Sequence, residues 1–124
     1  MESIMSKSII QMIKRICDDA LKGNLKLRDF HTLWPEKAND QLVFRQVYED
    51  LEDLIEHTPG SLFSGEIDYD NFYNSQAYLR VFFDRAILEH CDTIYKMERC
   101  RNSVLSHQRL SKEAIERCIK TCLD

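Results

Sequence analysis

The side chains whose type and spacing best suit chemistry are the carboxylates of one short segment. No basic residue lies between Gln46 and His57, and like charges recur four residues apart, as in Glu49 and Asp53. On a helix each such pair costs about 0.2–0.5 kcal/mol, whereas a pair of opposite sign stabilises by a similar amount. Because this segment lacks such stabilising pairs, its charge pattern favours a role in binding a positively charged partner. The alternative is a solvated helix face without such a role.

Other groups with catalytic or metal-binding chemistry form no recognisable site. The histidines stand in no spacing typical of a nucleophilic site, and the Glu-x-x-His motif of dimetal helical bundles does not occur. Asp53 and His57 could hold one metal with Glu49, but we favour a solvated helix face, with His57 stabilised near the negative end of the helix dipole. Asp68, Asp70 and Asn71 are not part of a twelve-residue calcium loop with a final Glu. We expect no enzyme activity, no metal and no cofactor.

The five cysteines are an odd number, and most of them stand at apolar helical positions. Cys118 and Cys122 are one helical turn apart, but zinc would need two more ligands, and the sequence has no second close pair of Cys or His. The first apolar stretch is broken by polar residues, so it does not read as a secretory signal. We therefore expect a cytoplasmic protein whose cysteines act as small apolar core residues.

Composition excludes several classes of function. With three Gly and two Pro in 124 residues, neither a glycine-rich phosphate loop nor a β-sandwich is expected. The net charge of -4 argues against direct nucleic-acid binding, and no run approaches the roughly 20 apolar residues of a membrane span. The negative charge is local, because residues 36–75 hold ten acids and only two bases.

Apolar periodicity predicts that helices must position these groups. We expect helices over about 6–22, 26–33, 39–57, from 70–75 onward, and 112–122. The fourth either continues to Leu105 or breaks near Asp92 and Thr93. Gly23 and Pro35 would end the first two helices, and Ser111 would cap the last. These elements predict an all-α, compact, bundle-like single domain of about five helices over residues 1–124.

The same periodicity divides the helix at 39–57 into two faces. The apolar face holds Phe44, Val47, Tyr48, Leu51, Leu54 and Ile55. The opposite face holds Glu49, Glu52, Asp53 and Glu56, with Asp50 at its edge. The loop that follows adds more acids and several aromatic side chains. In the shorter second helix, we expect Leu27, Phe30, Leu33 and Trp34 to pack in the core.

Two segments carry core residues and acids in a recognisable order, Leu25-x-Leu27-x-x-Phe30-x-x-x-Trp34-Pro35 and then Tyr48-Glu49-Asp50-Leu51-Glu52-Asp53-x-x-Glu56-His57. Over about residues 8 to 90 the chain resembles small all-α bacterial immunity proteins, the cytosolic antidotes of colicin-type or contact-dependent growth-inhibition toxins. The resemblance implies no enzyme activity, no cofactor and binding to one cognate toxin domain, often a nuclease. Binding residues vary between such pairs, so none is transferred to this chain.

Charge and resemblance together give one expectation about function. We expect an immunity protein that neutralises a basic toxin domain, a nuclease, by covering the surface with which the toxin holds phosphates. The alternative is a helical adaptor or regulatory subunit that docks on another basic cytosolic protein. From charge alone, the residues expected to bind the toxin are Glu49, Asp50, Glu52, Asp53, Glu56, Glu66, Asp68, Tyr69 and Asp70.

Overall fold

The computed structural model describes residues 3–58, 72–105 and 109–123. Within these ranges it contains six α-helices of at least seven residues, one 3-10 helix and no strand. The elements are α1 (Ser3–Leu21), α2 (Leu27–Leu33), η1 (Glu36–Asp40), α3 (Leu42–Glu56), α5 (Gln76–His90), α6 (Ile94–Leu105) and α7 (Lys112–Leu123). The all-α class is confirmed, but the expected number of five helices is too small. No described helix has the length and apolar content that crossing a membrane requires.

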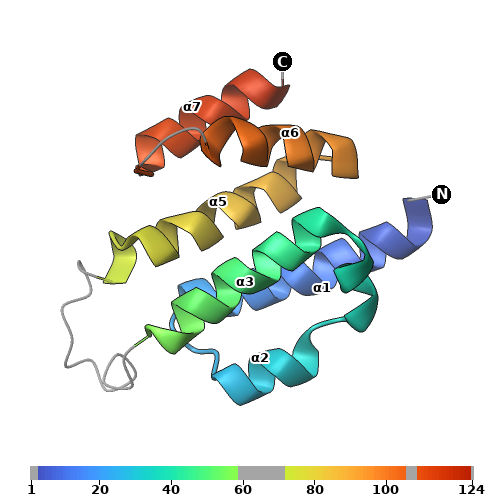
Figure 1. The fold of residues 1–124 in the computed structure, drawn as a ribbon, viewed down its shortest axis with the longest axis vertical. Helices are drawn as coiled ribbons and strands as arrows, with labels where there is room; N and C mark the ends of the chain where they lie inside the picture. Colours follow the sequence, from blue (N-terminus) through green and yellow to red (C-terminus); the bar gives the residue numbers. More distant parts are fainter. Residues whose placement is uncertain (1–2, 59–71, 106–108, 124) are drawn as a thin grey trace.

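Helix α5 occupies the centre of the arrangement. It packs against α1 and α3 on one side and against α6 and α7 on the other (Figure 1). Helix α2 lies against α3 on the side of the molecule far from α7 (Figure 1). A side chain of α5 that points toward both α3 and α6 is therefore enclosed by these two helices and by α5 itself.

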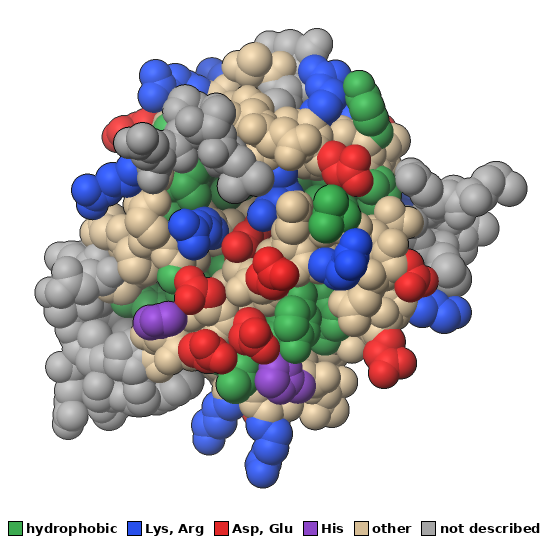
Figure 2. Space-filling view, viewed as in Figure 1, with side chains coloured by type: hydrophobic (Ala, Val, Ile, Leu, Met, Phe, Trp, Pro, Cys, Tyr) green, Lys and Arg blue, Asp and Glu red, His purple; other side chains and the backbone are tan. Residues whose placement is uncertain are grey.

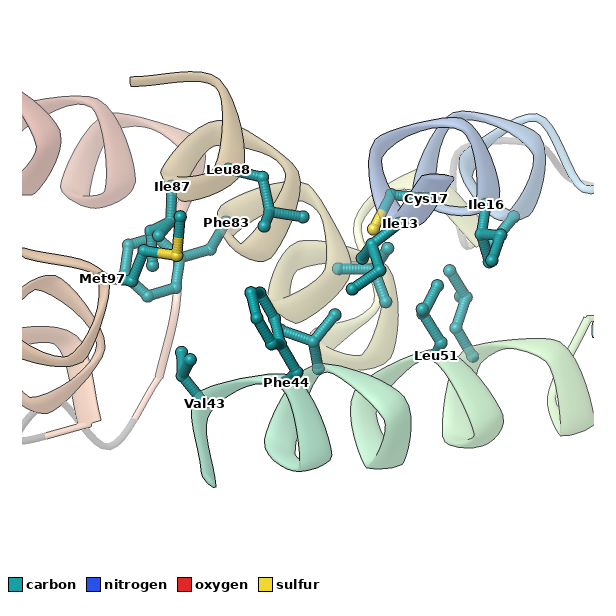
Figure 3. Close-up of a cluster of buried hydrophobic side chains, with 14 of the residues drawn as sticks. Ile13, Ile16, Cys17, Val43, Phe44, Leu51, Phe83, Ile87, Leu88 and Met97 are labelled. Atoms are coloured by element: carbon teal, nitrogen blue, oxygen red, sulfur yellow. The ribbon is translucent and has the colours of Figure 1, made fainter. Parts of the chain in front are cut away.

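The core is formed where α1, α3 and α5 face one another. Ile13 and Cys17 of α1 point toward Phe44 and Leu51 of α3, and all four are buried (Figure 3). Toward the other end of α5, the core continues to Met97 of α6, which is fully buried. Burial of each large apolar side chain contributes about 1.5–3 kcal/mol, so this shared core accounts for the close packing of the helices.

Three expected helix ends are confirmed by the local geometry. Gly23 has a positive φ of 74°, the left-handed conformation that glycine adopts most readily after a helix. Helix α2 ends at Leu33 before the extended Trp34, because Pro35 excludes helical geometry from the preceding residue. Ser111 caps α7, since its Oγ accepts a hydrogen bond from the backbone N–H of Ala114 at 3.1 Å.

One helix start differs from expectation, and the structure decides between the two alternatives left open for the fourth helix. The helix expected to begin at residue 39 or 40 begins at Leu42, because residues 36–40 form a 3-10 turn first. The fourth helix breaks rather than continuing to Leu105. Cys91 leaves helical geometry with φ -98° and ψ 136°, and Thr93 starts α6 by accepting a hydrogen bond from the N–H of Lys96 at 3.1 Å. A threonine hydroxyl in that position satisfies a backbone donor that a continuous helix would pair internally.

The expected core position of Leu33 is wrong, since 49% of this residue is exposed. Phe30 and Trp34 are buried instead, and both rings pack on Tyr48, with ring centroids 4.9 and 5.2 Å from it. A helix of seven residues presents a single narrow face to the core. Trp34 stands one turn after Phe30 on that face, whereas Leu33 lies beside it and is turned toward solvent.

Candidate protein-binding face

The outer side of α3 carries four carboxylates, which we call the acidic face: Glu49, Glu52, Asp53 and Glu56. Glu49 and Glu56 are exposed, and the side chains of Glu52 and Asp53 retain 37% and 43% of their accessible surface. Figure 2 shows acidic side chains gathered over α3, with histidines near the margins of the group. The four expected members of this face therefore lie on one surface.

Glu52 is held between α3 and α2. Its Oε2 lies 3.1 Å from Nε2 of His31 in α2 and accepts a hydrogen bond from the hydroxyl of Tyr48 at 3.5 Å. Burial and the adjacent Glu52 carboxylate raise the pKa of Tyr48, so the phenol stays a hydrogen-bond donor. Glu52 thus points in a fixed direction, an arrangement that lowers the entropy lost on binding.

Asp53 is paired with His57 at the C-terminal end of α3. Nδ1 of His57 lies 3.2 Å from Oδ1 of Asp53 and 2.7 Å from its backbone carbonyl oxygen. The carbonyl and then the carboxylate of Asp53 raise the pKa of His57. As pH falls toward that pKa, His57 gains a charge that offsets part of the acidic face.

Lysine and arginine leave the acidic face uncovered. Among the described residues, none of them forms an ion pair with Glu49, Glu52, Asp53 or Glu56. Arg45, one turn before Glu49, is the nearest base along α3 and makes no such pair. The negative charge of this surface is therefore available to an external cation or cationic protein.

Asp50 points away from the acidic face. Its Oδ2 lies 3.1 Å from Nη1 of Arg101, and the Nε of Arg101 donates to Oε1 of Gln46 at 3.1 Å. Only 16% of the Asp50 side chain is exposed. We therefore leave Asp50 out of the proposed binding surface, although its place at the edge of the acidic arc had suggested it.

Arg101 also donates to Asp84, a fully buried carboxylate in the middle of α5. The other carboxylate oxygen of Asp84 has no hydrogen-bond partner. Burial and the nearby Asp50 carboxylate raise the pKa of Asp84 well above its usual value, against the opposing effect of Arg101. Arg101 is thus surrounded by two carboxylates and an amide from α3 and α5.

Sequence reasoning missed this buried cluster. The signal for it was Asp84 itself, which shares a helical face with the buried Val81 and Leu88. An acid between two core positions requires a partner. The sequence offered no means of choosing Arg101 among nine bases in the C-terminal part, because that choice depends on how α6 crosses α3 and α5.

The remaining expected site residues fall outside the described ranges. These are Glu66, Asp68, Tyr69 and Asp70. In the described part, no group of three or more His, Cys, Asp or Glu side chains is arranged to hold a metal ion. The described residues therefore offer electrostatic attraction for a positively charged partner and carboxylates that can accept hydrogen bonds from it.

Comparison of the chain with protein-family models, with curated proteins and with solved structures finds no match in any of the three.

Proposed function

We propose that this protein is a non-catalytic binding protein whose acidic face docks on a basic protein. The observation that supports this most directly is the exposure of Glu49 and Glu56, together with two oriented carboxylates, without lysine or arginine against them among the described residues. A surface of one sign steers a partner of the opposite sign and fixes its orientation more than it adds raw affinity. Its expected signature is a fast association that slows as salt is added.

The more specific form of the proposal is an immunity protein that neutralises a nuclease toxin in the cytoplasm. It rests on the resemblance of the Leu25–Pro35 and Tyr48–His57 segments to bacterial immunity proteins. A nuclease holds a phosphate backbone with lysine and arginine. A row of carboxylates at helical spacing presents negative charge to the same side chains and would compete with the nucleic acid.

Apolar surface beside the acids is needed for tight binding, because exposed charge pairs contribute little affinity. Leu42 is 54% exposed and stands two turns before Glu49, on the same side of α3. Leu33 at the end of α2 is similarly exposed. A standard interface needs about 800 Å² on each partner. Leu42 and Leu33 supply apolar contacts at the α2 side of such a surface.

A pair of charge reversals tests the proposal. Glu49→Lys with Glu56→Lys changes two exposed acids for which no internal partner is recorded. Glu113→Lys with Glu116→Lys on α7 makes the same change in net charge away from α3, on equally exposed residues. The partner to use is the toxin domain that the immunity hypothesis places in the reading frame immediately upstream.

We expect the α3 variant to associate at least about tenfold more slowly at low salt, consistent with the range of electrostatic steering. The α7 variant should bind like the unaltered protein, and only the α3 variant should lose protection of growth. Equal affinity of the two variants for the toxin would contradict the acidic face. Charge-dependent binding to a partner without toxic activity would favour the adaptor alternative.

A further inference from the structure

We propose that Cys91 and Cys100 are an oxidisable pair that forms an intramolecular disulfide. Their sulfur atoms lie 3.7 Å apart. Cys91 occupies the position that ends α5, and Cys100 stands in the second half of α6. The break between the two helices therefore brings together two thiols that are nine positions apart in the sequence. This modification is independent of the function proposed for the acidic face.

The geometry requires only a small closure. A disulfide has a sulfur–sulfur distance of about 2.05 Å, so the two atoms must approach by roughly 1.7 Å. Cys91 has extended backbone geometry outside the helix, so its side chain is not held by an α-helical turn. Rotation about its Cα–Cβ bond and a slight shift of the connection at 92–93 supply the movement. Cys17, in contrast, is fully buried and stands inside the helix α1.

Exposure sets the order of the two chemical steps. Cys91 is 7% exposed and Cys100 is 1% exposed, so an oxidant in solution meets Cys91 first. The oxidant class that we name is a peroxide. The Cys91 thiolate attacks hydrogen peroxide, forms a sulfenic acid and releases hydroxide. The Cys100 thiol then attacks the sulfenic sulfur, the disulfide forms, and water leaves. In total two thiols and one hydrogen peroxide give one disulfide and two waters.

A third cysteine, Cys118, could compete with Cys91 for a disulfide to Cys100, and it therefore provides a control. Sγ of Cys118 in α7 lies 3.8 Å from the backbone carbonyl oxygen of Cys100. This contact of Cys118 is therefore with the backbone of Cys100 and not with its sulfur atom. The 3.7 Å sulfur–sulfur contact instead favours Cys91 as the sole partner of Cys100.

The disulfide would hold α6 against the end of α5. Arg101 directly follows Cys100 and donates to carboxylates of α3 and α5. The bond also closes a short loop, which restricts the unfolded chain more than the folded one. Oxidised protein should therefore unfold at a higher temperature than reduced protein.

The test is peptide mapping of the unaltered protein after treatment with hydrogen peroxide and blocking of the remaining thiols. We expect a mass loss of two hydrogens, located in a cross-linked peptide that contains Cys91 and Cys100 and reversed by dithiothreitol. Cys118→Ser should retain this cross-link, whereas Cys91→Ser and Cys100→Ser should abolish it. Mapping of the unaltered chain does not depend on whether those variants fold.

Several results would overturn the proposal. They are a cross-link between Cys100 and Cys118, oxidation to sulfinic acid without a cross-link, and protection of the thiols by a metal that co-purifies stoichiometrically. A cross-linked product whose melting temperature equals that of the reduced protein would contradict the constraint placed on α5 and α6.

Discussion

Arg101 of α6 donates to Asp84 of α5 inside the protein, where both side chains are withdrawn from water. The same guanidinium reaches Asp50 of α3, so a single arginine joins three helices. Ionised groups in such a place are costly unless they are paired. The cluster therefore helps to fix the position of α6 on α3 and α5. It does this through polar contacts and not through apolar packing.

Removal of the arginine should be strongly destabilising. In Arg101→Met, the Asp50 carboxylate would lose its cation, and the buried Asp84 carboxyl group would lose its hydrogen-bond donor. Breaking a buried pair in this way costs about 3–5 kcal/mol. The measurement is urea unfolding at pH 7, with Arg99→Met as the control, because Arg99 is exposed two residues earlier in the same helix. A loss below about 1 kcal/mol would mean that water reaches the cluster and solvates the acids.

Asp84 should make stability depend on pH. Its raised pKa means that the folded chain holds a proton over a range in which the unfolded carboxyl, with a pKa of about 3.9, has released it. Stability should therefore fall as pH rises from about 4 through the folded pKa. Asp84→Asn cannot titrate at this position. As pH rises above about 4, the unaltered protein should therefore lose stability relative to Asp84→Asn. A difference that is constant from pH 4.5 to 7.5 would refute the assignment.

Two serine caps should contribute measurably to the helices they begin. Ser75 and Ser111 each accept a hydrogen bond at 3.1 Å from the backbone N–H three residues on, at the starts of α5 and α7. Replacement of such a cap by alanine costs about 0.5–2 kcal/mol. We expect Ser75→Ala and Ser111→Ala to lower the free energy of unfolding by amounts in this range. Ser8→Ala, at an exposed position within α1, is the matched control.

The packing of α2 gives a contrast between neighbouring residues. Phe30→Ala should cost about 3–5 kcal/mol, because Phe30 is fully buried against Trp34 and Tyr48. Leu33→Ala should change stability by less than about 0.5 kcal/mol, because surface substitutions away from special features rarely do more. Thermal unfolding of the two variants distinguishes the structure, in which only Phe30 is buried, from the sequence expectation, in which both residues lie in the core. Similar losses would restore Leu33 to the core.

Local signals in the sequence were sufficient for several helix ends and for one side of α3. Gly23, Pro35 and Ser111 act on their immediate neighbours, so their effects follow from chain geometry alone. The acids of the acidic face were likewise placed by a period of 3.6 residues. Leu33 was misplaced because periodicity cannot say which of two adjacent apolar residues a two-turn helix will bury.

The buried cluster and the paired cysteines depend on contacts distant in sequence. Asp84 meets Arg101 across 17 positions and lies near Asp50 of α3, and Cys91 meets Cys100 only because the chain breaks between α5 and α6. Residue types alone did not decide between that break and a continuous helix, since the apolar pattern continues through it. Asp50 was assigned to the surface for the same reason, because its partner lies on another helix.

The acidic face should lower the stability of the free protein while serving its partner. Glu49 and Asp53 are like charges one turn apart, and so are Glu52 and Glu56. Relief of one such pair is worth about 0.2–0.5 kcal/mol. Glu56→Lys should therefore raise the free energy of unfolding slightly, by creating an attractive pair with Glu52, and the gain should shrink in high salt.

The same Glu56→Lys variant should associate more slowly with the toxin, so that stability and binding change in opposite directions. Unfolding in urea at low and high salt, combined with association kinetics of one protein preparation, checks both. Glu113→Lys on α7 is the control for the change in net charge. If Glu56→Lys were both more stable and equally fast to bind, the like charges along α3 would have no role in recognition, and the solvated-face interpretation would be preferred.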